Sequence, residues 1–141
     1  MSKEPRETFV LDSFAMLAFL DGESGMARVE DVLQIAQRGR AHAYMSMINL
    51  GEVLYITERE RGLPQAQQVL AAIEQLPITL VEATRERVLA AAHIKANWRV
   101  SYADAFTVAA ALELNGVLIT GDPEFKAIEH LARVEWLPNA A

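Results

Sequence analysis

Cysteine is absent from the 141-residue sequence, which excludes disulfide bonds and metal sites built on thiolates. Long apolar runs are also absent, and the longest near-continuous stretch, Phe14 to Leu20, is far too short to cross a bilayer. Residues 1–7 are mostly charged or polar and lack the apolar segment of a signal peptide. We therefore expect a cytoplasmic protein with no membrane-bound part.

Positive charge is scarce, because 13 Lys and Arg residues stand against 19 Asp and Glu residues and give a net charge of −6. This balance argues against a nucleic-acid binder with a general basic surface, since phosphate binding draws on clusters of Lys and Arg. It does not exclude a nuclease. A site built from carboxylates is negative until it binds divalent ions, which then supply the positive charge that meets the phosphate.

The chain has no internal repeat, low-complexity tract or Gly/Ser-rich linker, so we expect a flexible tail over residues 1–7 and one domain over residues 8–141. Apolar or β-branched runs predict five strands: Thr8–Asp12, Ala43–Ser46, Ile78–Val81, Val117–Thr120 and Val134–Leu137. Apolar residues recur at helical spacing between them, and Tyr102–Leu114 is an Ala-rich helical run that Asn115-Gly116 ends. Strands alternating with helices predict a parallel sheet inside a three-layer α/β/α sandwich.

Four acidic residues fall where the predicted strands end or the following helices begin. Asp12 ends the first strand, and Asp122 lies two residues past the fourth. Glu52 lies near the start of the helix after the second strand, and Asp104 opens the Ala-rich helix. In an open parallel sheet, binding groups collect beyond the carboxyl ends of the strands. Asp12 and Asp122 would therefore converge if the first and fourth strands are neighbours, with Glu52 and Asp104 closing the site from the helices.

Each of these acids also has a purely structural interpretation, because carboxylates are favoured at helix N-termini. Asp12 is a good N-cap for the helix that follows it. The segments Asn49–Glu52 and Ser101–Asp104 have the spacing of capping boxes. Asp122 followed by Pro123 is typical of a cap with proline at the first helical position. Spacing alone leaves both interpretations open.

A family resemblance rests on four segments that follow one another along the chain: Phe9–Ser13, Ser46–Val53, Ser101–Ala105 and Leu118–Phe125. In these segments the sequence resembles the PIN-domain ribonucleases, and specifically the toxins of VapBC-type toxin–antitoxin systems. The resemblance covers nearly the whole chain. It implies a PIN-like parallel five-stranded sheet in the order 3-2-1-4-5, which makes the first and fourth strands neighbours.

The resemblance also implies a set of catalytic acids, namely Asp12, Glu52, Asp104 and Asp122. Asp12, Asp104 and Asp122 would hold Mg²⁺ or Mn²⁺, because an all-carboxylate site without His or Cys favours such hard ions over zinc. Glu52 would bind the ion through water or help to position the attacking nucleophile.

Four further residues are candidates for an accessory or substrate-binding role. The resemblance implies a hydroxyl near the metal at Thr120, and Ser13 is a second hydroxyl candidate. Glu124 stands where many members of the family have Asp. Arg99 lies in the loop before Asp104, where it could contact a phosphate or stack on a base.

The function that the resemblance implies is metal-dependent endoribonuclease activity on unpaired RNA, such as loops of tRNA or ribosomal RNA. The implied partners are a cognate antitoxin and a second copy of the chain in a homodimer. Apolar residues around Phe14 to Leu20, with Met26 and Val29, are either a groove for the antitoxin or ordinary core. The alternative function is a catalytically silent PIN-like scaffold that binds RNA or protein, which a metal-dependent cleavage assay would distinguish.

Overall fold

The computed structural model of the chain describes residues 6–138. Residues 1–5 of the predicted tail lie outside the described residues. Glu7 already belongs to β1 (Glu7–Leu11), so the first strand begins one residue before Thr8, where the sequence predicts it. No helix in the described part of the chain combines the length and the apolar character needed to span a bilayer.

A parallel sheet of five strands forms the centre of the fold, in the order β3-β2-β1-β4-β5. The strands that follow β1 are β2 (Ala41–Ser46), β3 (Thr79–Val81), β4 (Val117–Thr120) and β5 (Val134–Trp136). Each predicted strand is present, with its ends within two residues of the prediction. The predicted pairing and strand order are confirmed.

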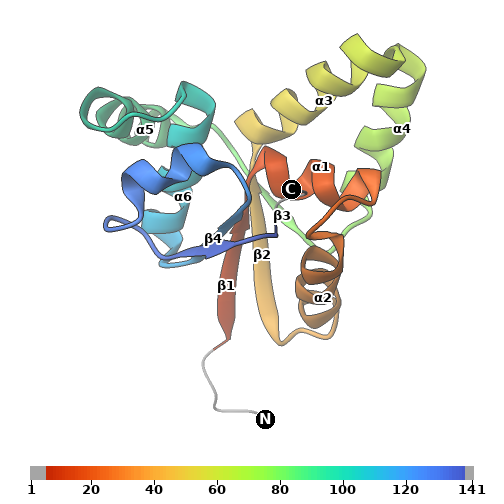
Figure 1. Ribbon diagram of the computed structural model, residues 1–141, viewed down its shortest axis with the longest axis horizontal. Helices are drawn as coiled ribbons and strands as arrows, with labels where there is room; N and C mark the ends of the chain where they lie inside the picture. The colour runs from red at the N-terminus through yellow and green to blue at the C-terminus, as the bar shows by residue number, and fades with distance from the viewer. Residues whose placement is uncertain (1–5, 139–141) are drawn as a thin grey trace.

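Helices cover both faces of this sheet. The α-helices are α1 (Ser13–Asp21), α2 (Met26–Gln37), α3 (Met47–Arg61), α4 (Leu63–Glu74), α5 (Arg85–Asn97) and α6 (Tyr102–Leu114), and a short 3₁₀ helix, η1 (Pro123–Ile128), follows β4. Figure 1 shows α1, α2 and α4 on one side of the sheet and α5 and α6 on the other. The predicted three-layer α/β/α sandwich is confirmed.

The central strands are buried on both faces, which explains their uninterrupted apolar sequences. In β1, Phe9 and Leu11 belong to a core shared with α1, α2, α3 and α4, whereas Val10 belongs to a second core shared with α5, α6 and η1. In β4, Ile119 and Leu118 divide between the same two cores. Successive side chains point to opposite faces of a strand, so one short strand contributes to both layers.

The strand order changes direction at β1, because β2 and β3 lie on one side of it and β4 and β5 on the other. This strand pairs with β2 on one side and with β4 on the other, and Leu11 lies opposite Ile119 in the register. The carboxyl ends of β1 and β4 are therefore side by side. Ligands of open α/β sheets bind at such a switch point.

Candidate metal centre

Asp12 directly follows β1 and is buried, with 2% of its surface exposed. As the N-cap of α1, its Oδ1 accepts a hydrogen bond from the backbone N–H of Ala15 at 2.8 Å, and its Oδ2 accepts one from the Thr120 hydroxyl. Burial raises the pKa of Asp12 to about 7; the two hydrogen bonds oppose this effect, and the nearby carboxylates of Asp122 and Glu52 add to it. A cation bound beside Asp12 would favour the charged form of its carboxylate and so lower this pKa.

Thr120, the last residue of β4, connects Asp12 to the turn that carries Asp122. Its side chain is fully buried, and its Oγ1 donates to Asp12 while accepting the backbone N–H of Asp122 at 3.0 Å. Asp122 in turn caps η1, because its Oδ1 accepts the backbone N–H of Glu124 at 3.0 Å. The predicted hydroxyl at Thr120 therefore lies between the carboxylate of Asp12 and the backbone of Asp122.

Asp104 enters the same space from the first turn of α6 and is 7% exposed. Burial raises the pKa of Asp104 to about 8, and the carboxyl group of Glu124 beside it raises it as well. Ser101 opposes the shift, while Asp12 and Asp122 contribute to it through repulsion of like charges. Asp104 is thus surrounded by acids that come from β1 and from the turn after β4.

Carboxylate oxygens of Asp104, Asp122 and Glu124 all lie within 4.8 Å of one another. This spacing lets one small ion contact all three after modest side-chain rotation. Within residues 6–138, no Lys, Arg or His forms an ion pair with these acids or with Asp12. Hard oxygen donors without a neutralising cation are the environment that Mg²⁺ and Mn²⁺ require, so the donor set fits such an ion. Glu124, which the sequence indicates only as an accessory residue, belongs to this group of three carboxylates.

Glu52 lies in α3, half-buried, and its Oε1 accepts a hydrogen bond from the hydroxyl of Ser13. Its charge contributes to the raised pKa of Asp12, so it borders the same group of acids. The structure therefore places Asp12, Asp104 and Asp122 near one another, with Thr120 bonded to Asp12. It places Glu52 near Asp12, bonded to Ser13.

Two buried polar residues at the site, Asn49 and Thr107, were not predicted from the sequence. Thr107 donates to Asn49 Oδ1 at 2.7 Å, and Asn49 Nδ2 donates to Ser13 Oγ at 3.2 Å. Asn49 was interpreted as the cap of a capping box, which is wrong: the N-cap of α3 is Ser46, whose side chain accepts the N–H of Ile48. A polar residue between Ile48 and Leu50 was the available signal for a buried network.

The N-caps expected at Asp12, Ser101 and Asp122 are present and compatible with the acidic site. Asp12 caps α1, Asp122 caps η1 ahead of Pro123, and Ser101 caps α6 by accepting the N–H of Asp104 at 3.1 Å. A cap directs one carboxylate oxygen to the helix N-terminus and leaves further lone pairs free. Capping thus fixes the carboxylates of Asp12 and Asp122 in place while leaving them able to bind an ion.

The profile of the PIN domain family matches residues 9–131 of the sequence. The chain belongs to the PIN domain family. The matched segment runs from β1 through η1 and contains every acid described above. No curated protein has significant sequence similarity to the chain.

Solved structures share this PIN fold at low sequence identity. VapBC2 from Rickettsia felis, bound to a promoter DNA fragment, has a TM-score of 0.73 at 14% identity, and the match covers 93% of this chain and 99% of that one. VapC20 from Mycobacterium tuberculosis, described as a toxin that cleaves the sarcin–ricin loop, has a TM-score of 0.69 at 18% identity, with 94% and 100% coverage. DNA-bound VapBC from Salmonella typhimurium has a TM-score of 0.73 at 18% identity, with 92% and 97% coverage. At such low identities, the similarity to these structures shows a shared fold alone.

Arg99 of this PIN domain is exposed in the loop between α5 and α6, and within the described residues it forms no ion pair. Trp98 beside it is half-buried and packs against the core of α5 and α6. The loop therefore has one aromatic residue anchored in the core and one free cation, five residues before the buried Asp104.

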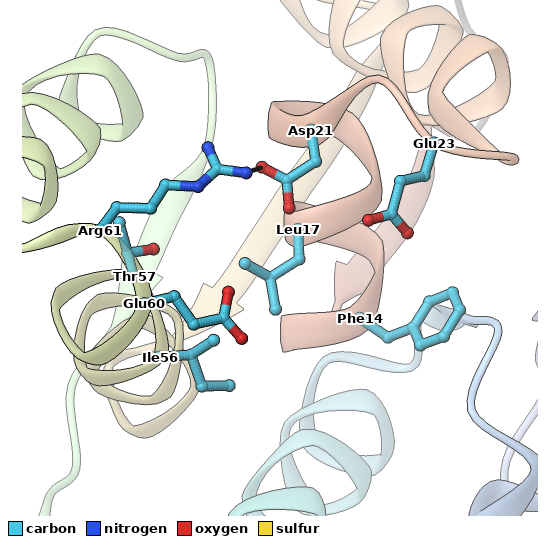
Figure 2. A pocket seen from close by; sticks show the side chains of 8 residues that line it. All are labelled: Phe14, Leu17, Asp21, Glu23, Ile56, Thr57, Glu60 and Arg61. Atoms are coloured by element: carbon cyan, nitrogen blue, oxygen red, sulfur yellow. Dashed lines mark ion pairs between the residues drawn. The ribbon is translucent and has the colours of Figure 1, made fainter.

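A pocket of about 210 Å³ lies between α1 and α3 of the PIN domain. Figure 2 shows its apolar side chains, Phe14, Leu17 and Ile56, with acidic residues around them. Asp21 pairs with Arg61 at 3.4 Å, which joins the two helices. The apolar residues that the sequence leaves as either groove or core therefore belong to both. Phe14 and Leu17 line the pocket, whereas Met16, Ala18 and Val29 are buried in the core.

Proposed function

We propose that this PIN domain is a Mg²⁺- or Mn²⁺-dependent endoribonuclease. One observation carries the proposal: the buried carboxylates of Asp12 and Asp104 lie close to those of Asp122 and Glu124 at the β1–β4 switch point, and none of the four forms an ion pair with a described Lys, Arg or His. Such a concentration of negative charge is costly unless a cation is bound.

The roles follow from where each side chain lies. Asp12, Asp104 and Asp122 would hold the ion, and Glu124 lies close enough to complete their donor set. Thr120 keeps Asp12 in place, since its hydroxyl donates a hydrogen bond to one carboxylate oxygen. Glu52, on the α3 side, would orient the attacking water. A bound divalent ion lowers the pKa of that water and stabilises the negative charge of the phosphate.

RNA with unpaired nucleotides is the proposed substrate, in a tRNA or ribosomal RNA. VapC20, which shares the fold, is described as cleaving the sarcin–ricin loop, and this supports a structured RNA loop as target. The exposed cation Arg99, near Asp104 in the sequence, could contact a phosphate or stack on a base that has left its helix. In a chain with a net charge of −6, local cations of this kind are the remaining route to phosphate contacts.

The biological role that we propose is the toxin of a toxin–antitoxin pair, acting in the cytoplasm as a homodimer. Several solved structures that share the fold are VapBC complexes, which supports an antitoxin partner. The α1–α3 pocket is suited to an antitoxin segment with an apolar side chain and a basic neighbour, because Glu23 and Glu60 line it beside Phe14 and Leu17, while Asp21 pairs with Arg61.

The experiment that tests this function compares RNA ends in cells after brief expression of the wild type and of the Asp12→Asn variant. We expect discrete new 5′-phosphate ends with the wild type and none with the variant. Equal patterns of RNA ends in the two cultures would overturn the proposal and favour the alternative, a catalytically silent scaffold.

A further inference from the structure

A buried row of hydrogen bonds crosses three helices behind the acidic site. It begins at Thr107 in α6, passes through Asn49 in α3 and Ser13 at the start of α1, and ends at Glu52 Oε1 in α3. Thr107 and Asn49 are fully buried, and Ser13 is 6% exposed. Only the last member, Glu52, is among the acids of the proposed active site.

The direction of these hydrogen bonds is fixed by a backbone carbonyl. Asn49 Nδ2 faces both Ser13 Oγ at 3.2 Å and the carbonyl oxygen of Ala103 at 3.4 Å. The reversed amide would point Oδ1 at the carbonyl of Ala103, and two acceptors cannot bond. The NH₂ group of Asn49 must therefore donate towards Ser13. Because Ser13 Oγ already accepts from Asn49, its own proton is free to go to the Glu52 carboxylate.

We propose that Asn49 is a positioning residue of the active site, which orients the Ser13 hydroxyl so that it donates to Glu52 and holds that carboxylate next to Asp12. The inference rests on the proposed ribonuclease function, since it assigns the means by which one acid of that site is oriented. Side chains on α3 and α6 thereby set the position of Glu52 through Ser13, which follows Asp12 in the chain. Oε2 of Glu52 has no hydrogen-bond partner within residues 6–138 and stays available for water or substrate.

A purely structural role predicts a different pattern of effects. If the row only fastened α1, α3 and α6 together, its loss would lower stability and leave the acid geometry unchanged. A positioning role requires that the loss act through Glu52, so the effect must disappear when Glu52 can no longer function as a carboxylate. A double-mutant cycle separates the two.

The test uses the full chain with Mn²⁺ and an RNA that the wild type cleaves. The two variants are Asn49→Ala and Ser13→Ala. Ser13→Ala removes the donor to Glu52 and leaves Asn49 its bonds to Thr107 and Ala103, so it can still test the proposal if Asn49→Ala folds poorly. We expect each change to lower kcat roughly 10- to 100-fold with KM nearly unchanged, as for the loss of one charge-assisted hydrogen bond. In a Glu52→Gln background, Ser13→Ala should lower kcat by less than about 2-fold. Ser13→Thr, which keeps the hydroxyl, should restore most of the rate.

A matched control is Val32→Ala, which removes apolar volume from a fully buried position in α2, a helix that contributes no residue to the row. It should lower the melting temperature at least as much as Ser13→Ala without lowering kcat. Equal effects of Ser13→Ala with and without Glu52→Gln, or full activity of the Asn49→Ala variant, would overturn the proposal.

A second readout does not depend on RNA cleavage. Crystal structures of the wild type and the Asn49→Ala variant should differ in the side-chain position of Glu52, with the Ser13–Glu52 hydrogen bond lost in the variant. An unchanged Glu52 in the variant would refute the positioning role. If the wild type cleaves no RNA, the proposed function fails, and this comparison still decides the role of Asn49.

Discussion

At the scale of single residues, the proposed metal centre contains carboxylates that folding buries, where their charged forms are unfavourable. Burial is the main cause that raises the pKa of Asp12 to about 7 and that of Asp104 to about 8. Both groups are therefore partly protonated near neutral pH when no ion is bound. Metal binding must displace those protons, so metal affinity, stability and pH are linked.

The first prediction concerns the stability of the metal-free protein against pH. An acid with a raised pKa in the folded state binds its proton more tightly there than in the unfolded chain. The bound proton therefore favours the folded state, and this contribution to the free energy of unfolding is lost as the pH rises. For Asp12 and Asp104 this loss runs from the unfolded pKa of 3.8 up to about 7 and about 8. In EDTA, the melting temperature should be higher near about pH 5 than near about pH 8.5.

Addition of Mg²⁺ should reverse that trend, because deprotonated carboxylates bind the ion best. The increase in melting temperature on adding Mg²⁺ should therefore be larger at the higher pH, and the Asp104→Asn variant should lose most of it. A metal-free protein that is more stable at the higher pH would contradict this account of Asp12 and Asp104.

The second prediction concerns Thr120, whose hydroxyl holds Asp12 and accepts the backbone N–H of Asp122. Thr120→Val keeps the shape but leaves both partners without this bond in a fully buried position. We expect a loss of about 1–3 kcal/mol in the free energy of unfolding, measured by urea denaturation. Thr120→Ser should recover most of it, and a Val variant as stable as the wild type would exclude the structural role.

At the scale of helices and strands, local chemistry determined which elements the sequence could predict. Tyr102–Leu114 was predicted with the correct ends, because Ser101 caps the helix and Asn115 ends it in a left-handed conformation with φ 51°. The strand Val117–Thr120 was also correct at both ends, since its uninterrupted apolar residues match a strand buried on both faces.

Long-range pairing of polar groups was not predictable in the same way. Asn49 and Thr107 are 58 positions apart, and only the packing of α3 against α6 brings them into contact. The grouping of Glu124 with Asp104 also depends on how η1 follows β4. Topology supplied the convergence of Asp12 with Asp122, but the side-chain network around them required the three-dimensional structure.

The third prediction concerns Gly121, which lies between Thr120 and Asp122. A Cβ added there would lie 2.3 Å from Cε1 of Phe14, so an alanine at this position would force that ring to move. Gly121→Ala should destabilise the fold by about 1–3 kcal/mol through overpacking. The same change in a Phe14→Ala background should cost clearly less, and equal costs in the two backgrounds would show that the contact with Phe14 is not the reason for glycine.

At the scale of the whole molecule, the acidic centre and the α1–α3 pocket are connected through Phe14. Phe14 is one of the residues that line the pocket, and its ring packs on Gly121 in the turn that carries Asp122. A partner bound in the pocket would therefore contact a side chain that touches the acidic centre.

The fourth prediction concerns that pocket. Leu17→Glu adds a negative charge to a pocket already lined by Asp21, Glu23 and Glu60, so a basic partner segment would lose its apolar contact. We expect the proposed cognate antitoxin to suppress RNA cleavage by the wild type and to bind the variant about 10- to 100-fold more weakly, measured by calorimetry. Leu112→Glu, at an exposed position near the end of α6, is the matched control. Equal affinity for the wild type and the Leu17 variant would remove the pocket from the partner interface.

The most direct test of the central claim is a crystal structure of the protein soaked in Mn²⁺ and measured at a wavelength where manganese scatters anomalously. An anomalous peak is expected among Asp104, Asp122 and Glu124, within about 2–2.5 Å of carboxylate oxygens. The peak should be absent from Asp104→Asn crystals soaked in the same way. No peak at these carboxylates in the wild type, or a peak that persists unchanged in the variant, would contradict the account.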